Sequence, residues 1–312
     1  MRTLTDDHVA DLTWEAVLDA LEGAFLDPGQ FLMADRVMLP APDDGAYLTM
    51  PCADVEGWFG VKQVSVAPRN PARGLPSVQA WYTLFDPQGR PVIGAQAGLL
   101  TRLRTAAVSA VAAERLASPG ARNLLMVGTG SLAPWLVRAH LQVRGYETVW
   151  IWGRDPAKSE RVAADVLAAF TGATSRPAVV VADDLEAAVR RADVISVATT
   201  SRAPLVRGAW LSPRQHLDLV GAFVHGMREC DAEAVSACDV FVDQRAAARH
   251  EAGDLAAAAD EGWSWNDVVG DLHDVVRGAA GRREGRPTLF KSVGLAFEDL
   301  VVARLLAPQA AG

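Results

Sequence analysis

A glycine-containing turn between an apolar segment and a helical one constrains the fold of this chain more than any other feature. The apolar run Asn123–Val127 predicts a buried strand, and Leu132–Gly145 has the apolar spacing of a helix. The string GTGSLA at Gly128–Ala133 joins them. Its first glycine permits a tight turn, its second lets a pyrophosphate approach the backbone, and its alanine permits close helix–strand packing. The pattern predicts a dinucleotide site at the N-terminus of the helix.

Strands and helices alternate after this unit. The expected strands are Thr148–Trp152, Ala178–Val181, Val194–Ala198, Gln215–Val220 and Val240–Asp243, and the expected helices are Ser159–Phe170 and Leu185–Ala192. Such alternation is typical of a parallel, doubly wound α/β sheet. We therefore expect a Rossmann dinucleotide-binding domain over residues 118–287.

The regions on either side of this domain have a different pattern. Short β-like runs separated by Pro, Gly and Asn predict a mainly antiparallel sheet, with strands at Ala46–Met50, Phe59–Val66, Val78–Phe85 and Pro91–Ala95. Helices are expected at Thr13–Leu26 and Thr101–Leu116. From Thr288 a short strand precedes an apolar helix, which we expect to pack back on the first region. Residues 255–260 and 278–286 are interpreted as loop or helix-end material.

Composition excludes several classes of function. The net charge of −8 offers no basic footprint for nucleic acid, and no apolar run reaches the ~18 residues of a membrane span. The three cysteines include no CxxC pair, and no secretory signal is apparent, so we expect a reducing, cytoplasmic location. The histidines have no metal-ligand spacing, and no GxSxG string occurs. We expect neither a metal nor a serine nucleophile.

The end of the second Rossmann strand bears on the choice of cofactor. An acidic residue there accepts the 2′-hydroxyl of NAD, whereas an arginine accepts the 2′-phosphate of NADP. The expected acidic position is Gly153, and Arg154 follows it. The pattern favours NADP(H). NAD(H) stays open, because Asp155 is close and Arg154 could instead cap a helix end.

Lys62 is the most unusual polar residue of the N-terminal region. Of the 30 Lys and Arg residues only Lys62, Lys158 and Lys291 are lysine, so each stands out against an arginine-rich background. Lys62 lies within the apolar run Phe59–Val66. A buried ammonium is costly unless an anion pairs with it, which points to a substrate carboxylate or imine. The alternative is a lysine at a strand edge that faces water.

Other candidate ligands are less specific. Arg36, Arg104 and Thr105 could bind an anion, and Arg104 is expected in the first helical turn, where the helix dipole disfavours a cation. A structural salt bridge would explain it equally. Thr199 and Ser201 follow the fourth Rossmann strand, at the edge where such folds bind ligands, although a plain turn would have the same residues.

Several strings taken together make the chain resemble the ornithine cyclodeaminase/μ-crystallin family. The resemblance covers nearly the whole length. It rests on MP at Met50–Pro51, GVK at Gly60–Lys62, LTRLRTAA at Leu100–Ala107, GTG at Gly128–Gly130, MRE at Met227–Glu229 and FKSVGLAFED at Phe290–Asp299. The resemblance implies that the Rossmann domain is inserted in a second α/β domain, formed by residues 1–117 and 288–312, which binds substrate and forms a homodimer.

The same resemblance implies roles for individual residues. Arg36, Lys62 and Arg104 would hold the α-carboxylate of the substrate, with Lys62 near its C=N nitrogen. Thr105 would contact the cofactor phosphates, and Ser292 to Gly294 would lie near the nicotinamide. With the motif residues, the expected cofactor-binding set is Thr105, Gly128, Gly130, Ser131, Arg154, Thr199, Ser201, Phe223, Ser292 and Gly294.

The implied activity is NAD(P)H-dependent reduction of a cyclic ketimine, Δ1-pyrroline-2-carboxylate or Δ1-piperideine-2-carboxylate, to the L-amino acid. Cyclodeaminases of the family carry an aspartate where this chain has Phe223, and phenylalanine cannot act as a base. The alternatives are an ornithine or lysine cyclodeaminase, an enzyme of acyclic imino or amino acids, such as an alanine dehydrogenase or iminosuccinate reductase, and a non-catalytic, crystallin-like protein that binds the cofactor.

Overall fold

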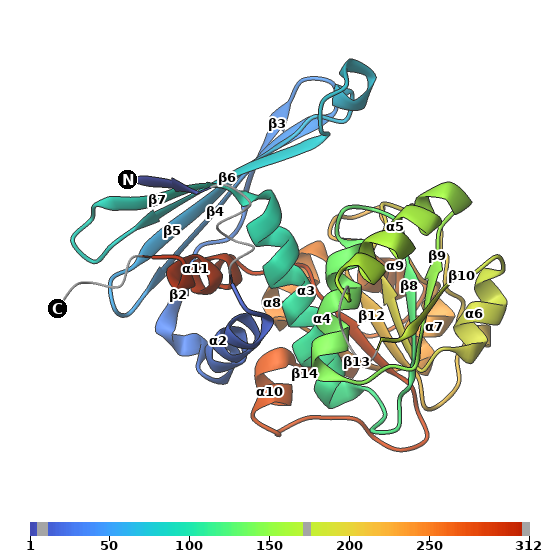
Figure 1. Cartoon of the computed structure of the whole chain (residues 1–312). Coiled ribbons are helices and arrows are strands. Elements are labelled where there is room, and N and C mark those ends of the chain that lie inside the picture. The colour runs from blue at the N-terminus through green and yellow to red at the C-terminus, as the bar shows by residue number, and fades with distance from the viewer. Residues whose placement is uncertain (5–11, 171–175, 308–312) are drawn as a thin grey trace. The chain divides into compact units, whose positions relative to one another are not determined.

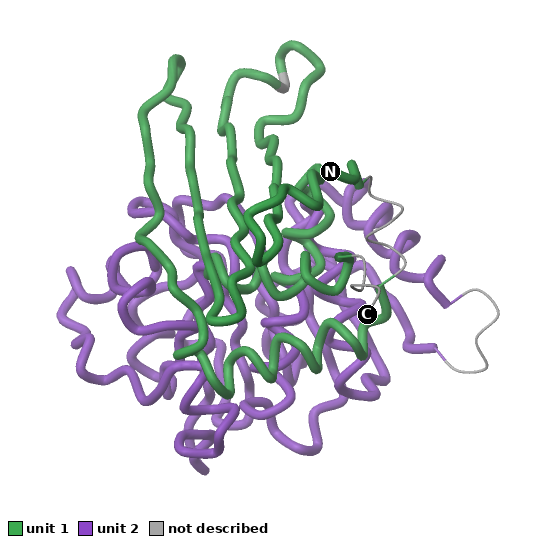
Figure 2. The backbone as a smooth tube through the Cα atoms, turned by 90° about the vertical axis from the view of Figure 1, so that its left-hand side faces the viewer, with its two compact units in different colours: residues 1–105, 295–312 green, residues 106–294 purple. Residues whose placement is uncertain are grey.

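The computed structural model describes residues 1–4, 12–170 and 176–307 (Figure 1). The chain divides into two compact units, residues 1–105 with 295–312, and residues 106–294 (Figure 2). The second unit is thus a continuous insertion in the first. Helix α3, Ala97–Leu116, runs across one of the two junctions.

The inserted unit contains the expected parallel sheet. In its described part eight strands follow the order β10-β9-β8-β11-β12-β15-β13-β14, all pairs parallel. The strands are β8 Asn123–Val127, β9 Thr148–Trp152, β10 Ala178–Val181, β11 Val194–Val197, β12 His216–Leu219, β13 Asp239–Val242, β14 Val268–Asp271 and β15 Thr288–Lys291. Their nearly continuous apolar character follows from burial on both faces of a parallel sheet.

Helices connect these strands. They are α4 Ala133–Val143, α5 Pro156–Ala168, α6 Leu185–Arg191, α7 Ala232–Ala237, α8 Arg245–Glu251, α9 Gly253–Asp260 and α10 Leu272–Val276, with short 3₁₀ turns at Gly208–Trp210 and Trp265–Asp267. The fold class expected from the sequence is confirmed. Residues 255–260, interpreted as loop or helix-end material, all belong to helix α9 and include its C-terminal end, so the loop alternative is wrong for this segment.

The terminal strand corrects the sequence-based domain boundary. Residues 288–312 were all expected in the substrate-binding domain, yet β15 pairs with β12 on one side and β13 on the other. It therefore completes the Rossmann sheet, and the chain returns to the first unit only at Leu295. A four-residue apolar strand carries no signal for which of two sheets it joins.

The first unit is built on an antiparallel sheet. Its strands are β1 Arg2–Leu4, β2 Phe31–Met33, β3 Val37–Ala41, β4 Gly45–Asp54, β5 Phe59–Val66, β6 Val78–Phe85 and β7 Pro91–Gln96, ordered β1-β7-β6-β5-β4-β2, with β3 also on β4. All pairs are antiparallel except β1 with β7. Short 3₁₀ turns lie at Pro28–Gln30 and Asn70–Arg73.

Two helices of this unit pack together against the sheet. Helix α2, Trp14–Leu26, is capped by Thr13, whose hydroxyl accepts from the Ala16 amide at 3.3 Å. Helix α11, Ala296–Leu305, contacts α2, β4 and β5. The ring of Phe297 lies 4.9 Å from Phe25, edge to face, and 4.9 Å from Phe31, stacked. The expectation that the terminal helix packs on the first region is confirmed.

One row of residues across neighbouring strands of this sheet contains Lys62. Met50, Lys62, Tyr82 and Ala95 lie opposite one another on β4, β5, β6 and β7, and all are buried. Beside this row only glycine fits at Gly60, because a Cβ there would lie 1.8 Å from the Tyr82 hydroxyl. Lys62 thus faces the protein interior, and the alternative of a strand-edge lysine in water is wrong.

No helix in the described residues is long and apolar enough to cross a membrane. Nor do the described His, Cys, Asp and Glu residues form a group that could hold a metal ion.

Candidate active site

Lys62 and Arg104 belong to a buried ionic cluster in the first unit. The Lys62 ammonium donates to Asp299 at 2.6 Å. The Arg104 guanidinium donates to the other oxygen of Asp299 at 3.3 Å and to Glu298 at 2.5 Å. Both acids lie in the first turn of α11, where the positive end of the helix dipole stabilises them. All four side chains are at most 6% exposed.

The structure corrects the reasoning about Arg104. The sequence predicted a helix from Thr101 with Arg104 in its first turn, but α3 begins at Ala97 and Arg104 lies in its second turn. The conflict with the helix dipole therefore disappears. Its two acid partners on α11 explain its position, and the sequence could not reveal them because they lie 194 and 195 residues away.

Electrostatics leave Lys62 within reach of neutral pH. Burial lowers the pKa of Lys62 most, the Arg104 charge lowers it further, Asp299 raises it, and Arg36 lowers it, with a result of about 8. Burial alone would raise the pKa of Asp299, but Arg104 and Lys62 outweigh it and hold that pKa below its usual range. Asp299 is therefore an anion between two cations.

Two further titratable neighbours of the cluster, Tyr82 and Cys52, are uncharged. Burial raises the pKa of Tyr82 well above its usual value, and Asp299 raises it further. Burial, Asp54 and Asp299 raise the pKa of the Cys52 thiol to about 12. Asp54 itself accepts from Arg304 at 2.6 Å. Lys62, Arg104 and Asp299 are therefore the charged centre of the cluster, with Glu298 beside Arg104 and the Arg36 charge near enough to lower the pKa of Lys62.

In the inserted unit the glycine loop has the geometry that its sequence predicts. Gly128 has φ +125°, and a Cβ on it would lie 2.4 Å from the Ala198 carbonyl oxygen. Around Gly130 a Cβ would meet nothing within 4 Å, and Ser131 beside it is exposed. Helix α4 begins without a side-chain cap directly after this loop, so the positive end of its dipole faces the loop. The loop fits the pyrophosphate of a dinucleotide.

The loop after β9 leaves no room for an acid at Gly153, the position that the sequence pattern singles out. A Cβ on Gly153 would lie 2.5 Å from the Thr129 methyl group, so no side chain fits there. The Asp155 carboxylate accepts from the Ala157 amide at 3.1 Å and caps α5. The sequence left open whether Arg154 caps a helix end. Arg154 is exposed and caps no helix, and Asp155 is the N-cap of α5 instead.

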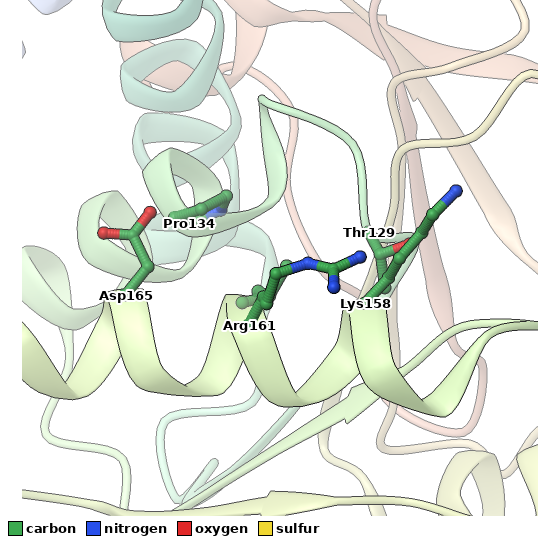
Figure 3. A pocket seen from close by; sticks show the side chains of 6 residues that line it. Thr129, Pro134, Lys158, Arg161 and Asp165 are labelled. Carbon is green, nitrogen blue, oxygen red and sulfur yellow. The ribbon is translucent and has the colours of Figure 1, made fainter.

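A hollow of about 310 Å³ lies beside this loop, between Thr129, Pro134 and helix α5. Figure 3 shows the side chains of Lys158 and Arg161 extending from α5 along it, toward Thr129. Within the described chain Lys158 and Arg161 form no ion pair, whereas Asp165, at the other end, pairs with Arg138 at 2.5 Å. The sequence reasoning missed Arg161; its spacing of three residues from Lys158 on a helix was the available signal.

A buried glutamate joins the loops at the carboxyl edge of the sheet. Glu229 accepts from the Thr199 amide at 2.6 Å, the Thr199 hydroxyl at 3.0 Å, and the amides of Gly221 at 2.7 Å and Ala222 at 3.3 Å. The Thr199 hydroxyl in turn accepts from Ser201. Glu229 therefore holds the segments that follow β11 and β12. In the sequence, only the MRE string at Met227–Glu229 indicated that Glu229 is a notable residue.

A second carboxylate holds the segment after β15. One oxygen of Asp243 accepts from the amides of Val293 at 2.6 Å and Gly294 at 2.8 Å. Ser292 is buried, and Gly294 has φ +83°. Phe223, after β12, is 40% exposed. The loops that carry Thr199, Phe223 and Ser292 thus follow strands β11, β12 and β15, which neighbour one another in the sheet.

The structure therefore groups the sequence-predicted residues into two sets. Lys62, Arg104 and Arg36 form a cation cluster in the first unit, to which Thr105 is adjacent in sequence. The other predicted cofactor residues lie in loops of the inserted unit, and no described contact tests their roles. Asp299, Glu298, Glu229 and Asp243 are the residues that the motif search did not assign to the site.

Comparison with known proteins places these features in a family. Residues 3–312 match the ornithine cyclodeaminase/mu-crystallin family. The chain is 37% identical to Delta(1)-pyrroline-2-carboxylate reductase of Paracoccus denitrificans, over 98% of this chain and 96% of that one. The structure of Thermococcus litoralis Delta(1)-pyrroline-2-carboxylate reductase in complex with NADH and L-proline matches with a TM-score of 0.92 and 30% identity, over 98% and 96% of the two chains.

A structure described as an archaeal alanine dehydrogenase dimer with bound NAD matches with a TM-score of 0.88 and 27% identity, over 97% of this chain and 94% of that one. The full-length family match and the identities above 30% agree with the strings found in the sequence. The chain belongs to the ornithine cyclodeaminase/mu-crystallin family.

Proposed function

We propose that this protein reduces a cyclic α-imino acid, Δ1-pyrroline-2-carboxylate or Δ1-piperideine-2-carboxylate, to the L-amino acid with a reduced nicotinamide cofactor. The observation that carries the proposal is the buried cluster in which Lys62 and Arg104 share the Asp299 carboxylate, with Arg36 close enough to lower the pKa of Lys62. Its relatives in Paracoccus and Thermococcus are named for this reaction.

The cluster suits a monoanionic substrate. Arg36, Lys62 and Arg104 bring three positive charges together, and a substrate carboxylate would be attracted to them. A buried charge is costly unless an opposite charge accompanies it, so the cluster favours a substrate that carries an α-carboxylate. In this role Arg104 offers a planar guanidinium and Lys62 a compact ammonium.

The reaction needs one hydride and one proton. A bound NAD(P)H supplies the hydride that adds to the imine carbon, and the C=N double bond becomes a C–N single bond while the cofactor is oxidised. The imine nitrogen gains the proton. Lys62, with a pKa of about 8, is charged at neutral pH and able to release a proton, so we assign it the role of proton donor at that nitrogen, directly or through a water.

We further propose NADP(H) as the preferred cofactor. Gly153 leaves no room for an acid that would accept a 2′-hydroxyl, and Asp155 is occupied as a helix cap. Arg154, Lys158 and Arg161 supply positive charge at the loop and the adjacent hollow, as a 2′-phosphate requires. The expected contacts to the pyrophosphate are those of Gly128, Gly130 and Ser131.

We expect Arg154→Ala and Arg161→Ala each to raise the KM for NADPH about tenfold and to leave the KM for NADH nearly unchanged, because each removes one charge-assisted contact to phosphate. Steady-state kinetics with both cofactors measure this. Arg191→Ala, an exposed arginine at the end of α6, is the matched control. Equal kinetic losses with NADPH and NADH would contradict recognition of the 2′-phosphate.

We also propose that the protein is a homodimer formed through the open face of the antiparallel sheet. A hollow of about 770 Å³ lies there, lined by β4, β5, β6, the end of β7 and the first turns of α3, and Tyr47 and Val78 at it are half exposed. Met38 and Leu39 on β3 are likewise exposed. Such apolar surface suits a second copy. Light scattering should give twice 33.2 kDa, and Val78→Glu should give the monomer.

The direct test follows NADPH and NADH oxidation by absorbance with both cyclic imines, with pyruvate plus ammonia, and with oxaloacetate plus ammonia. Ammonia release from ornithine and from lysine is measured in parallel. Fast turnover of a cyclic imine without ammonia release is the expected result. Turnover of only the keto acids would identify an enzyme of acyclic substrates, ammonia release would identify a cyclodeaminase despite Phe223, and cofactor binding without turnover would identify a non-catalytic protein.

A further inference from the structure

Lys62 and Arg104 differ in the number of carboxylates that they contact. Arg104 contacts two carboxylates, Glu298 and Asp299. Among the described residues Lys62 hydrogen-bonds one carboxylate, Asp299, at 2.6 Å. Loss of Glu298 would leave Arg104 a counter-ion. Loss of Asp299 would leave the buried Lys62 ammonium with none in hydrogen-bond contact.

The other charged groups around Lys62 cannot replace Asp299. Arg104 on α3 and Arg36 between β2 and β3 both disfavour a charged Lys62. Asp54 on β4 is engaged by Arg304 of α11 at 2.6 Å. The titratable groups on the adjacent strands, Cys52 on β4 and Tyr82 on β6, are neutral. Asp299 is thus the group that opposes burial and two like charges at Lys62.

The two oxygens of Asp299 also fix a direction. One oxygen holds the Lys62 ammonium and the other holds the Arg104 guanidinium, so a single planar carboxylate aligns two donors that come from β5 and α3. Asp299 itself is held at the start of α11, whose helix is anchored by Phe297 between Phe25 and Phe31. Its orientation therefore depends on packing that involves no substrate.

We propose that Asp299 is a positioning residue for the reaction: it keeps Lys62 protonated and aims its ammonium, whereas Glu298 pairs with Arg104. This inference rests on the proposed function, in which Lys62 holds the substrate carboxylate and gives up the proton. The two adjacent acids of α11 then have different roles: Asp299 controls the protonation of Lys62, and Glu298 pairs with Arg104.

The pH dependence of kcat/KM is the readout that a purely structural role would not move. A protonated Lys62 is required, so the wild-type rate should fall as pH rises through its pKa of about 8. Asp299 raises that pKa, so its removal lowers it. We call this fall of kcat/KM at high pH the alkaline limb of the pH profile. In Asp299→Asn the alkaline limb should move to lower pH by about 1–3 units, the usual effect of one nearby charge.

Three further variants make the comparison specific. Glu298→Gln removes an equal charge one residue away and should leave the limb nearer to the wild-type position. The arginine side chain in Lys62→Arg stays protonated up to pH ~12, so the residual activity of this variant should not fall near pH ~8. Asp299→Glu keeps the charge and should keep the limb within about half a unit, because the sign of the neighbouring charge is what matters. Titration of the substrate imine is common to all variants and cancels.

Binding of pyrrole-2-carboxylate, a planar carboxylate with no C=N bond to reduce, provides a measure that needs no turnover. Its affinity, measured by calorimetry, should weaken above pH ~8 in the wild type and at lower pH in Asp299→Asn. NADPH binding and circular dichroism establish that each variant is folded. If Asp299→Asn does not fold, Asp299→Glu and Glu298→Gln carry the test: a limb that moves by a unit or more in Asp299→Glu overturns the inference.

The possible failures are distinguishable. A wild type that reduces the imine, with an alkaline limb that Asp299→Asn leaves in place, overturns the role of Asp299 alone. Equal displacement in Glu298→Gln and Asp299→Asn overturns the division of tasks. A wild type that reduces no imine contradicts the proposed function, and the pH dependence of pyrrole-2-carboxylate binding then decides the Asp299 inference by itself.

Discussion

Replacing Lys62 with methionine is expected to lower kcat/KM for the cyclic imine by about 10²–10⁴-fold, the usual loss when a positioned proton donor is removed. Methionine approximates the length of the lysine stem and suits a site that is 3% exposed, so packing is largely kept. What disappears is the ammonium that pairs with Asp299 at 2.6 Å. The measurement is NADPH oxidation at saturating cofactor.

Cofactor affinity is the control for this variant. The glycine loop belongs to the inserted unit, whereas Lys62 lies in the first unit, so NADPH should bind Lys62→Met with nearly wild-type affinity. Fluorescence of the bound dihydronicotinamide reports that affinity. If Lys62→Met kept more than about a tenth of the activity, the ammonium would have no chemical role and the proton would have to come from elsewhere.

The second large effect is expected at the glycine loop, where two alanine substitutions should act differently. A Cβ on Gly130 meets nothing within 4 Å, so Gly130→Ala should fold with an unchanged melting temperature. Its affinity for NADPH and NADH should nevertheless fall at least about tenfold, because a pyrophosphate must approach the bare backbone there. Calorimetric titration with each cofactor measures the loss.

Gly128→Ala should instead damage the protein itself. Its Cβ would lie 2.4 Å from the Ala198 carbonyl oxygen, and its φ of +125° is rarely adopted by residues with a side chain. We expect a loss of about 1–3 kcal/mol in the free energy of unfolding together with the loss of cofactor binding. Gly145→Ala, also in open surroundings, controls for the substitution itself. Wild-type cofactor affinity in Gly130→Ala would show that no phosphate passes over that residue.

Local sequence patterns predicted most of the fold because burial on both faces of a parallel sheet produces short apolar runs. The bounds of Asn123–Val127, Thr148–Trp152 and Phe59–Val66 are those of β8, β9 and β5. The strands that the pattern missed, such as β1 and β2, are three residues long. Residues of such short segments acquire strand geometry from the neighbour that pairs with them, and no periodicity records that neighbour.

The candidate site was predictable only in part, for a similar reason. Lys62 stood out as a charge in an apolar strand, and Gly128 and Gly130 stood out by their spacing from a strand and a helix. The partner of Lys62 did not, because Asp299 lies 237 residues further along the chain. The role of Asp155 as the N-cap of helix α5 was not predicted either, because the sequence pattern assigned a possible helix cap to Arg154.

The insertion of one unit into the other gives the molecule an order of assembly during synthesis. Strand β5 and the start of α3, which carry Lys62 and Arg104, leave the ribosome long before α11, which carries Glu298 and Asp299. The whole inserted unit, residues 106–294, is translated in between. Lys62 and Arg104 therefore obtain their counter-ions only when the last described helix has been made, after residues 106–294 have been synthesised.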